Sequence, residues 1–329
     1  MRLQSYHRHN QGRIHGFQAT TVVTPAASLG IGSMDATVAR GAIGQPTITP
    51  RLQFSRRPLV VGATTVAIGA GSYIGCTVVP TTSAIAAQFL NSGGSGVDGT
   101  GDIIALGWDS TDTDETGLQE LKCSLQTPRL FATRIDTNGT VLQGKKCIRS
   151  VVKGGTGVYT LTFNDGFGRN PVVALTGEGA RFAAYTSKTQ NTIVIQTYDV
   201  SGVAQDGRFH LAVLGQDGAD EFGKLRNPVM SDYELHPVGF GVTAAGGTLN
   251  VGSADASGIV KNGTGDFTIT FKKPFGKVPV ACSRAVSQAK TSISSVTATA
   301  IRVLVTNAAG VAADTDFDVI VFGSPERGE

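Results

Sequence analysis

A phrase of eleven residues occurs twice in this chain. The first copy, KGGTGVYTLTF, occupies residues 153–163, and the second, KNGTGDFTITF, occupies residues 261–271. We call the separation between residue 153 and residue 261 the repeat offset. At this offset, and without a gap, about half of the positions in 152–174 are identical to their counterparts in 260–282. Because self-similarity at a fixed spacing is the mark of repeated structural modules, the sequence predicts two homologous modules in tandem.

Each copy of the phrase has the pattern of a β-strand that follows a tight turn. Tyr159, Leu161 and Phe163 alternate with small or polar residues, so one large apolar row faces a core and the other row faces outward. The closing segments FHLAVLG and FDVIVFG alternate in the same way. Glycine is abundant, at 43 of 329 residues, which suits many turns. Short strands separated by turn signals indicate antiparallel β-sandwiches.

A weaker third copy lies nearer the N-terminus. One more step of the repeat offset places Gly107 on Gly215 and the segment DIIALG under HLAVLG. The remaining alignment needs gaps, and it predicts a divergent third sandwich. The expected fold is all-β: tandem antiparallel β-sandwich modules with an extended N-terminal arm. The expected division is an arm (1–35), a divergent sandwich-like domain (36–115) and two sandwich modules (116–222 and 223–329).

Three stretches of the first module carry separate expectations. TTSAIAAQFL, residues 81–90, is compatible with a short helix, whereas the strands elsewhere leave little room for helices. NSGGSGVDGTGD, residues 91–102, has the composition of a flexible loop. DSTDTDETG, residues 109–117, has that of a solvated linker to the next module. Because strings of small sandwiches make stiff spacers, such a chain is expected to project from a surface.

The sequence contains no arrangement of residues typical of catalysis, and neither a cofactor nor a metal is expected. There is no G-x-S-x-G elbow, and the histidines have no triad context. The four cysteines lack CxxC pairing and are interpreted as free thiols, with a Cys123–Cys147 bridge left open. The acids of residues 109–115 resemble a calcium loop in composition alone, because the required order and glycine are missing.

Charge is unevenly distributed along the chain. The net charge of +3 is too small for a nucleic-acid-binding protein. Residues 1–57 carry seven arginines and one acid, whereas residues 98–120 carry seven acids and no basic residue. The N-terminus has no apolar segment of a secretory signal, and no membrane partner is expected. We interpret the first residues as an arm that docks on an acidic partner surface. Its candidate docking residues are Arg2, Arg8, Arg13, His7, His9 and His15.

Together these motifs resemble a known group of modules. Asn138-Gly139-Thr140, Gly155–Phe163, Pro171–Ala174 and Phe209–Gly215, with their second copies, are similar to the small β-sandwich modules of tailed-bacteriophage virion proteins, found in fibres, knobs and head decorations. The resemblance covers roughly residues 125–323. It implies a structural role in the virion, commonly as trimers or other symmetric clusters, and it implies no catalytic residues.

Three functions follow as hypotheses. The first is a bacteriophage structural protein that decorates or cements the capsid exterior through its N-terminal region. Its expected partners are the major capsid protein or another virion protein and further copies of itself as a symmetric homo-oligomer, most simply a trimer. The second is a tail fibre, spike or adaptor subunit whose C-terminal sandwich binds host surface glycan. The third is a glycan depolymerase, which we disfavour because clustered carboxylates are absent from the sequence pattern.

Overall fold

The computed structural model describes most of the chain. It describes residues 16–23, 28–32, 36–50, 58–64, 73–76, 80–107, 128–168, 170–179, 181–216, 236–243, 247–251, 256–285 and 289–323. The regular secondary structure of these residues consists of β-strands and one 3₁₀ turn, η2 (Lys145–Cys147), and turns and irregular segments connect the strands. The all-β expectation is confirmed for the described part of the chain.

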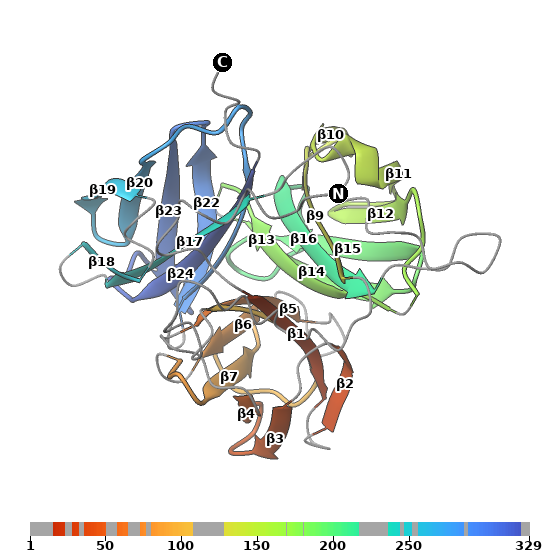
Figure 1. Cartoon of the computed structure of the whole chain (residues 1–329), viewed down its shortest axis with the longest axis horizontal. Helices are drawn as coiled ribbons and strands as arrows, with labels where there is room; N and C mark the ends of the chain where they lie inside the picture. Colours follow the sequence, from red (N-terminus) through yellow and green to blue (C-terminus); the bar gives the residue numbers. More distant parts are fainter. Residues whose placement is uncertain are drawn as a thin grey trace, which may run out of the picture.

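The described strands form three units of eight, which we call sandwich 1, sandwich 2 and sandwich 3 (Figure 1). Sandwich 1 contains β1 (Gly16–Val23), β2 (Ser28–Gly32), β3 (Ala36–Arg40), β4 (Pro46–Pro50), β5 (Leu59–Thr64), β6 (Tyr73–Cys76), β7 (Ile85–Leu90) and β8 (Thr100–Gly107). Sandwich 2 contains β9 (Pro128–Ile135), β10 (Val141–Gln143), β11 (Ile148–Lys153), β12 (Val158–Phe163), β13 (Val172–Gly177), β14 (Phe182–Lys188), β15 (Thr192–Tyr198) and β16 (Phe209–Gln216). Sandwich 3 contains β17 (His236–Thr243), β18 (Thr248–Val251), β19 (Ala256–Gly263), β20 (Asp266–Phe271), β21 (Val280–Ala285), β22 (Ala289–Val296), β23 (Ala300–Asn307) and β24 (Phe317–Gly323).

The three sandwiches have the same strand connectivity. One sheet of each has the order β2-β1-β8-β5, β10-β9-β16-β13 or β18-β17-β24-β21. The other sheet has the order β3-β4-β7-β6, β11-β12-β15-β14 or β19-β20-β23-β22. Each eight-strand unit therefore repeats the previous one, strand for strand. All the described pairings within these sheets are antiparallel.

The two copies of the repeated phrase lie at the same place in sandwiches 2 and 3. They form β12 and β20, and Phe163 and Phe271 are both buried in the core of their own sandwich. Leu161 and Ile269, one step earlier on the same face, are also fully buried. The glycine before each strand, Gly157 in the first copy, has a positive φ, as expected for a tight turn. The duplication predicted from the sequence is confirmed at these positions.

Sandwich 1 differs from the sequence expectation in three places. Strands β1 and β2 fall within the region expected as an arm, yet β1 pairs along its whole length with β8 and extends the sheet of sandwich 1. Residues 85–90, expected as part of a short helix, form strand β7, because their apolar residues pack into the core of sandwich 1. Residues 91–98, expected as a flexible loop, form an ordered turn in which Ser95 N–H bonds to the Asn91 side chain.

The sandwiches form a closed ring rather than a string. Figure 1 shows them around a common centre, with β5 and β13 turned inward, and sandwich 3 contributes β21 and β24 to the same central contact. Twelve buried apolar residues from all three sandwiches make one central core there. This arrangement corrects the expectation of a projecting spacer. The ring closes because the inward sheets carry a second apolar face, and the described residues of these faces pack against one another across the three sandwiches.

Strand β13 contributes side chains to two different cores. Val173 and Leu175 face the core of sandwich 2, whereas Val172 and Ala174 face the central core. All six residues of β13 are buried, as are those of β5 and β21. The same alternation runs through β16, where Leu211 and Leu214 belong to different cores. A strand buried on both faces reads as a continuous apolar run, which explains the segments VVAL and LVV.

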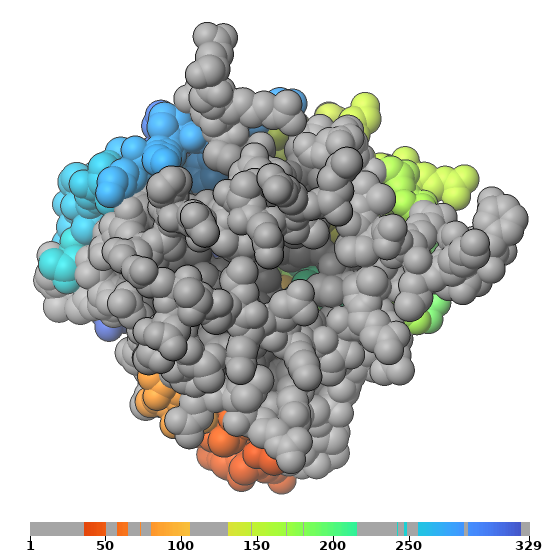
Figure 2. All heavy atoms as spheres, viewed as in Figure 1, coloured from red at the N-terminus to blue at the C-terminus, as the bar shows by residue number. Residues whose placement is uncertain are grey.

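The arrangement of three sandwiches around one centre is also visible at the molecular surface. In Figure 2, the coloured residues of sandwiches 1, 2 and 3 appear at three separate corners of the molecule. The three sandwiches are related by rotation about an axis through the central core, and we call this the pseudo-threefold axis.

Candidate functional site

Three polar side chains lie at equivalent positions of the three sandwiches, in the region where the sandwiches meet. Asp102 on β8, His210 on β16 and Asp318 on β24 are related by successive steps of the repeat offset, and each is fully buried. A buried polar group destabilises a fold unless it forms hydrogen bonds. Each of these three side chains therefore requires partners inside the ring.

Each of the three side chains accepts a hydrogen bond from the backbone of the next sandwich. The bonds run from Val173 N to Asp102 Oδ2 (2.9 Å), from Ala281 N to His210 Nδ1 (3.0 Å) and from Val60 N to Asp318 Oδ2 (3.4 Å). Sandwich 1 thus accepts from sandwich 2, sandwich 2 from sandwich 3, and sandwich 3 from sandwich 1. This head-to-tail pattern closes on itself, as a heterologous interface does in a cyclic trimer.

Two of these positions also hold buried ion pairs. Arg284 donates to Asp318 Oδ2 at 2.8 Å and, across the junction, to the carbonyl oxygen of Val60 at 2.8 Å. Lys188 donates to Asp102 from the neighbouring sandwich. Removing one partner of such a pair leaves a charge buried without compensation, which typically costs about 3–5 kcal/mol. The pairs therefore make correct closure of the ring strongly preferred over displaced packings.

The third position forms a different network, because His210 replaces an aspartate. Its Nδ1 accepts the Ala281 N–H and so carries no proton, and its Nε2 lies 3.4 Å from Glu178 Oε2. Arg134 binds the same carboxylate with two nitrogens, at 2.7 and 2.9 Å. Burial raises the pKa of Glu178, but His210 and Arg134 outweigh burial and lower that pKa to about 2. Burial also lowers the pKa of His210, against the opposing effect of Glu178.

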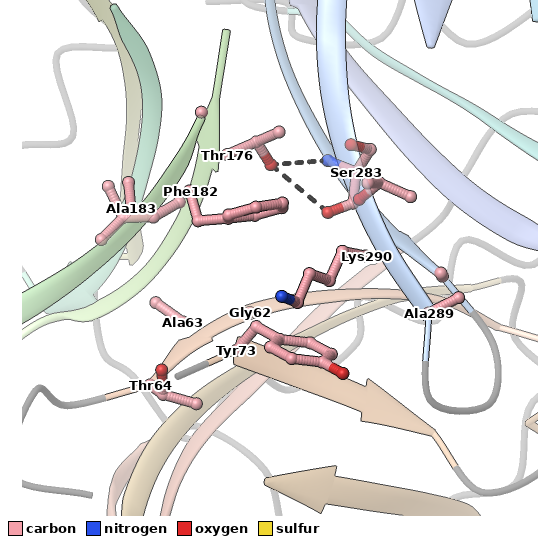
Figure 3. Close-up of a pocket in the computed structure, with 14 residues that line it drawn as sticks. Gly62, Ala63, Thr64, Tyr73, Thr176, Phe182, Ala183, Ser283, Ala289 and Lys290 are labelled. Atoms are coloured by element: carbon pink, nitrogen blue, oxygen red, sulfur yellow. Dashed lines mark hydrogen bonds between the residues drawn. The ribbon is translucent and has the colours of Figure 1, made fainter. Parts of the chain in front are cut away.

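A small cavity of ≈ 40 Å³ lies where the three sandwiches meet (Figure 3). Its wall is shared by all three sandwiches and includes Gly62, Tyr73, Thr176, Phe182, Ser283 and Lys290. A water molecule needs about 10–15 Å³ of such space. Small-molecule sites usually occupy about 300–1,000 Å³. The cavity therefore suits water or a single small ion and is too small for an organic substrate.

Thr176 and Ser283 join sandwiches 2 and 3 at the edge of this cavity. Thr176 Oγ1 accepts from Ser283 N at 2.9 Å and donates to Ser283 O at 3.3 Å, as the dashed lines in Figure 3 show. One hydroxyl thus satisfies both backbone groups of a residue in the neighbouring sandwich. This reciprocal bond fixes the register between β13 and β21.

The junction was not predicted from the sequence, although a signal for it exists. Each closing strand has a polar residue at the same position in an otherwise apolar run, as in GDIIALG, FHLAVLG and FDVIVFG. The sequence interpretation assigned only the alternating apolar row to a core. The candidate docking residues Arg2, Arg8, Arg13, His7, His9 and His15 lie outside the described residues.

Other chemistry expected or left open from the sequence can be placed in the described part of the chain. Neither Cys147 nor the buried Cys282 belongs to a disulfide in the described part of the chain, and Cys123 lies outside the described residues. No group of three or more His, Cys, Asp or Glu side chains able to hold a metal gathers among the described residues. Of the segments described, none is a helix with the length and apolar character needed to cross a membrane.

Comparisons with known proteins add no relative. No protein-family model, no curated protein and no solved structure matches this chain.

Proposed function

We propose that this chain is a structural protein of a bacteriophage virion that decorates the capsid exterior as a three-lobed unit. The observation that carries the proposal is the closed ring of three equivalent sandwiches, in which the same backbone-to-side-chain hydrogen bond recurs at each junction. The similarity of its repeated motifs to phage virion modules supports the same role. Both features suit a rigid building block better than a binding cleft.

The pseudo-threefold axis suggests where such a unit attaches. A molecule with three similar lobes presents three similar surfaces, so it can contact three symmetry-related subunits of a shell at once. Contacts that are individually weak add up when they are made simultaneously. We therefore propose attachment over a threefold or local threefold position of the shell, with one chain supplying the symmetry that a homotrimer would otherwise supply.

The N-terminal residues remain the proposed docking element. Arginines pair with carboxylates through a planar fork, which suits an extended arm on an acidic surface. Strand β1 begins at Gly16 and pairs with β8, so a deletion that tests the arm must stop at residue 15. The variant R2Q/R8Q/R13Q tests the same contact without shortening the chain.

The experiment adds purified protein to virions that lack it and measures the amount bound. The deletion of residues 1–15 and the triple Arg→Gln variant should remain folded, and each should bind at least about tenfold less, because several charged contacts are lost together. The control K272Q/K273Q/K277Q removes three exposed charges from sandwich 3, and it should bind as the wild type does. Undiminished binding of the arm variants would place the anchor in the folded ring.

Copy number distinguishes capsid decoration from the tail-fibre alternative. Decoration predicts copies that scale with the number of shell subunits, whereas a tail fibre or spike predicts a few tens of copies at most. Quantitative mass spectrometry of whole virions against the major capsid protein measures this ratio. A low copy number with binding to host glycan would replace the capsid proposal with the fibre alternative.

A further inference from the structure

Three backbone carbonyls converge at one point on the pseudo-threefold axis. They belong to Ser92, Val200 and Ala308, which are related by successive steps of the repeat offset and come one from each sandwich. The three oxygens are therefore equivalent by the internal symmetry of the chain. Their partial negative charges face a common centre, where they require a donor or a cation.

Three matching turns hold these carbonyls in place. Gly94, Gly202 and Gly310 have φ values of 82°, 84° and 82°, so each turn has the same left-handed residue. In each turn a side-chain oxygen of the first residue accepts a backbone N–H four residues later, at 2.9–3.0 Å. A Cβ added to Gly94 would lie 2.5 Å from the Ala308 Cβ, which shows how closely the turns of sandwiches 1 and 3 approach.

The occupant of this point is the Lys290 ammonium. Its Nζ lies 2.9 Å from Ser92 O, 3.3 Å from Val200 O and 2.9 Å from Ala308 O. An ammonium group has three N–H donors, so each donor meets one sandwich. The Lys290 residue is 2% exposed. One side chain of sandwich 3 thus binds the backbone of all three sandwiches.

Two aromatic rings complete the surroundings of the ammonium. Nζ lies 5.3 Å from the centre of the Tyr73 ring and 5.0 Å from that of Phe182, and Figure 3 shows it between the two. Tyr73, Phe182 and Lys290 occupy equivalent positions, because their strand partners Leu90, Tyr198 and Thr306 are themselves related by the repeat offset. Ring faces attract cations, most strongly where water is excluded.

We propose that the axis carries a binding site for a monovalent cation of ammonium or potassium size, and that the chain fills this site with its own Lys290 ammonium. Carbonyl oxygens arranged around a point replace the hydration shell of such cations. The tethered cation stabilises the closed ring, because the three carbonyls surround it only when all three turns are in place. Burial lowers the pKa of Lys290, so alkaline solution should weaken this stabilisation.

The internal symmetry provides a direct test by exchange of residues. In the double variant F182K/K290F, the ammonium reaches the same axis from sandwich 2. The single variant K290F removes the cation, and F182K places two ammonium groups side by side, so each should lower Tm by at least about 5 °C. The double variant should recover most of the loss, which makes the two changes strongly non-additive. Additive losses would overturn the proposal, because the axis would then not be the binding site.

Chemical rescue tests the class of ligand. The variant K290M keeps an unbranched side chain that is shorter than lysine by the charged end atom, so it leaves the carbonyls without a cation. Its Tm should rise with ammonium or potassium chloride, in a saturable way, above its value in choline chloride of equal ionic strength. The control K261M removes an exposed lysine and should show no difference among the three salts. Equal Tm values for K290M in all three salts would contradict a cation site.

A measurement on the wild-type protein decides the matter if the variants do not fold. Lysine ammonium protons exchange with water too quickly to be seen by NMR unless they are buried and hydrogen-bonded. We expect a slowly exchanging Lys290 ammonium resonance near neutral pH that disappears in alkaline solution, assigned by its loss in the variant K290R. Absence of that resonance at low temperature would overturn the proposal.

Discussion

His210 occupies the position at which the other two sandwiches have aspartate. Its neutral form accepts the Ala281 N–H, and a proton on Nδ1 would turn that acceptor into a donor facing another donor. Around it lie Glu178 and Arg134, with the Arg208 Nη1 3.8 Å from the Glu178 carboxylate. Burial keeps the folded-state pKa of His210 below its ordinary value of 6.5. The junction between sandwiches 2 and 3 should therefore respond to pH differently from the other two.

The sign of the pH effect follows from this lowered pKa. A group with a depressed folded-state pKa contributes stability above its unfolded pKa and loses that contribution as the pH falls. The free energy of unfolding should therefore decline as the pH drops below about 6.5. His210→Asn keeps an acceptor for Ala281 and cannot titrate, so urea unfolding followed by circular dichroism should show a flatter profile between pH 6.5 and 5. Both proteins should still lose stability below pH 4.5, where Glu178 begins to protonate towards its pKa of about 2. Identical profiles above pH 5 would exclude His210 as the cause.

At the scale of the structural element, one turn recurs three times. Asp98, Asp206 and Asp314 each accept the N–H of a positive-φ glycine and pair with a cation at the end of β3, β11 or β19. In sandwich 2, Gly157 N–H bonds to Asp206 at 2.7 Å, and Lys153 pairs with the same carboxylate. The hydrogen bond from Lys153, followed by that from Gly157, lowers the pKa of Asp206. In sandwiches 2 and 3 the repeated GTG sequence thus encodes a turn that precedes a central strand of the second sheet, and Gly44 in the sequence GAIG takes the same place in sandwich 1.

The geometry of this turn predicts that alanine substitutions at two nearby glycines lower the free energy of unfolding by very different amounts. Gly157 has a φ of 72°, and an added Cβ would lie 2.5 Å from the Thr197 carbonyl oxygen. Gly155 has open space around its missing Cβ. Gly157→Ala should therefore lower the free energy of unfolding by roughly 1–3 kcal/mol or more, whereas Gly155→Ala should change it by about 0.5 kcal/mol at most. Chemical denaturation of both variants measures the difference, and equal losses would contradict the strained-turn interpretation.

At the scale of the whole molecule, one matched pair of variants distinguishes the role of a sandwich core from the role of the central core. Leu161 belongs to the core of sandwich 2, and Leu214 belongs to the central core. Either Leu→Ala change should cost about 2–5 kcal/mol. The Cys282 thiol, buried in the central core with its pKa raised to about 12 by burial, reports opening of the ring. Thiol labelling under native conditions should accelerate more in Leu214→Ala than in Leu161→Ala. Equal acceleration would mean that the ring opens only when the whole chain unfolds.

Solution mass tests whether one chain is the complete unit. The sequence led us to expect a homotrimer, partly because glycine-rich strand edges need covering. In the ring, the inward sheets of all three sandwiches are covered within one chain. We expect light scattering at micromolar concentration to give the mass of a single chain, 34.0 kDa. A mass three times larger would restore the homotrimer, with three rings in one assembly.

Local pattern determined much of the fold by itself. The fixed repeat offset predicted that Phe163 and Phe271 occupy equivalent core positions, and the alternation around them predicted antiparallel strands. These features could be predicted because strand pairing and turn chemistry depend on neighbouring residues. Sandwich 1 was harder, because longer connections before and after β6 move β5 and β6 away from the repeat offset. Residues 85–90 have weak local preferences, and packing into a sheet overrode them.

Ring closure was decided only by the tertiary structure. A period of two indicates which residues share a strand face, but it does not say whether solvent, a second sheet or another sandwich covers that face. Val172 and Ala174 alternate in the same way whether they face water or a central core. Asp102, His210 and Asp318 differ in chemistry, so their shared role appears only when each is seen to accept a backbone N–H across a junction. Lys290 meets three carbonyls from turns far apart in sequence, a contact set by rotation of whole sandwiches about an axis.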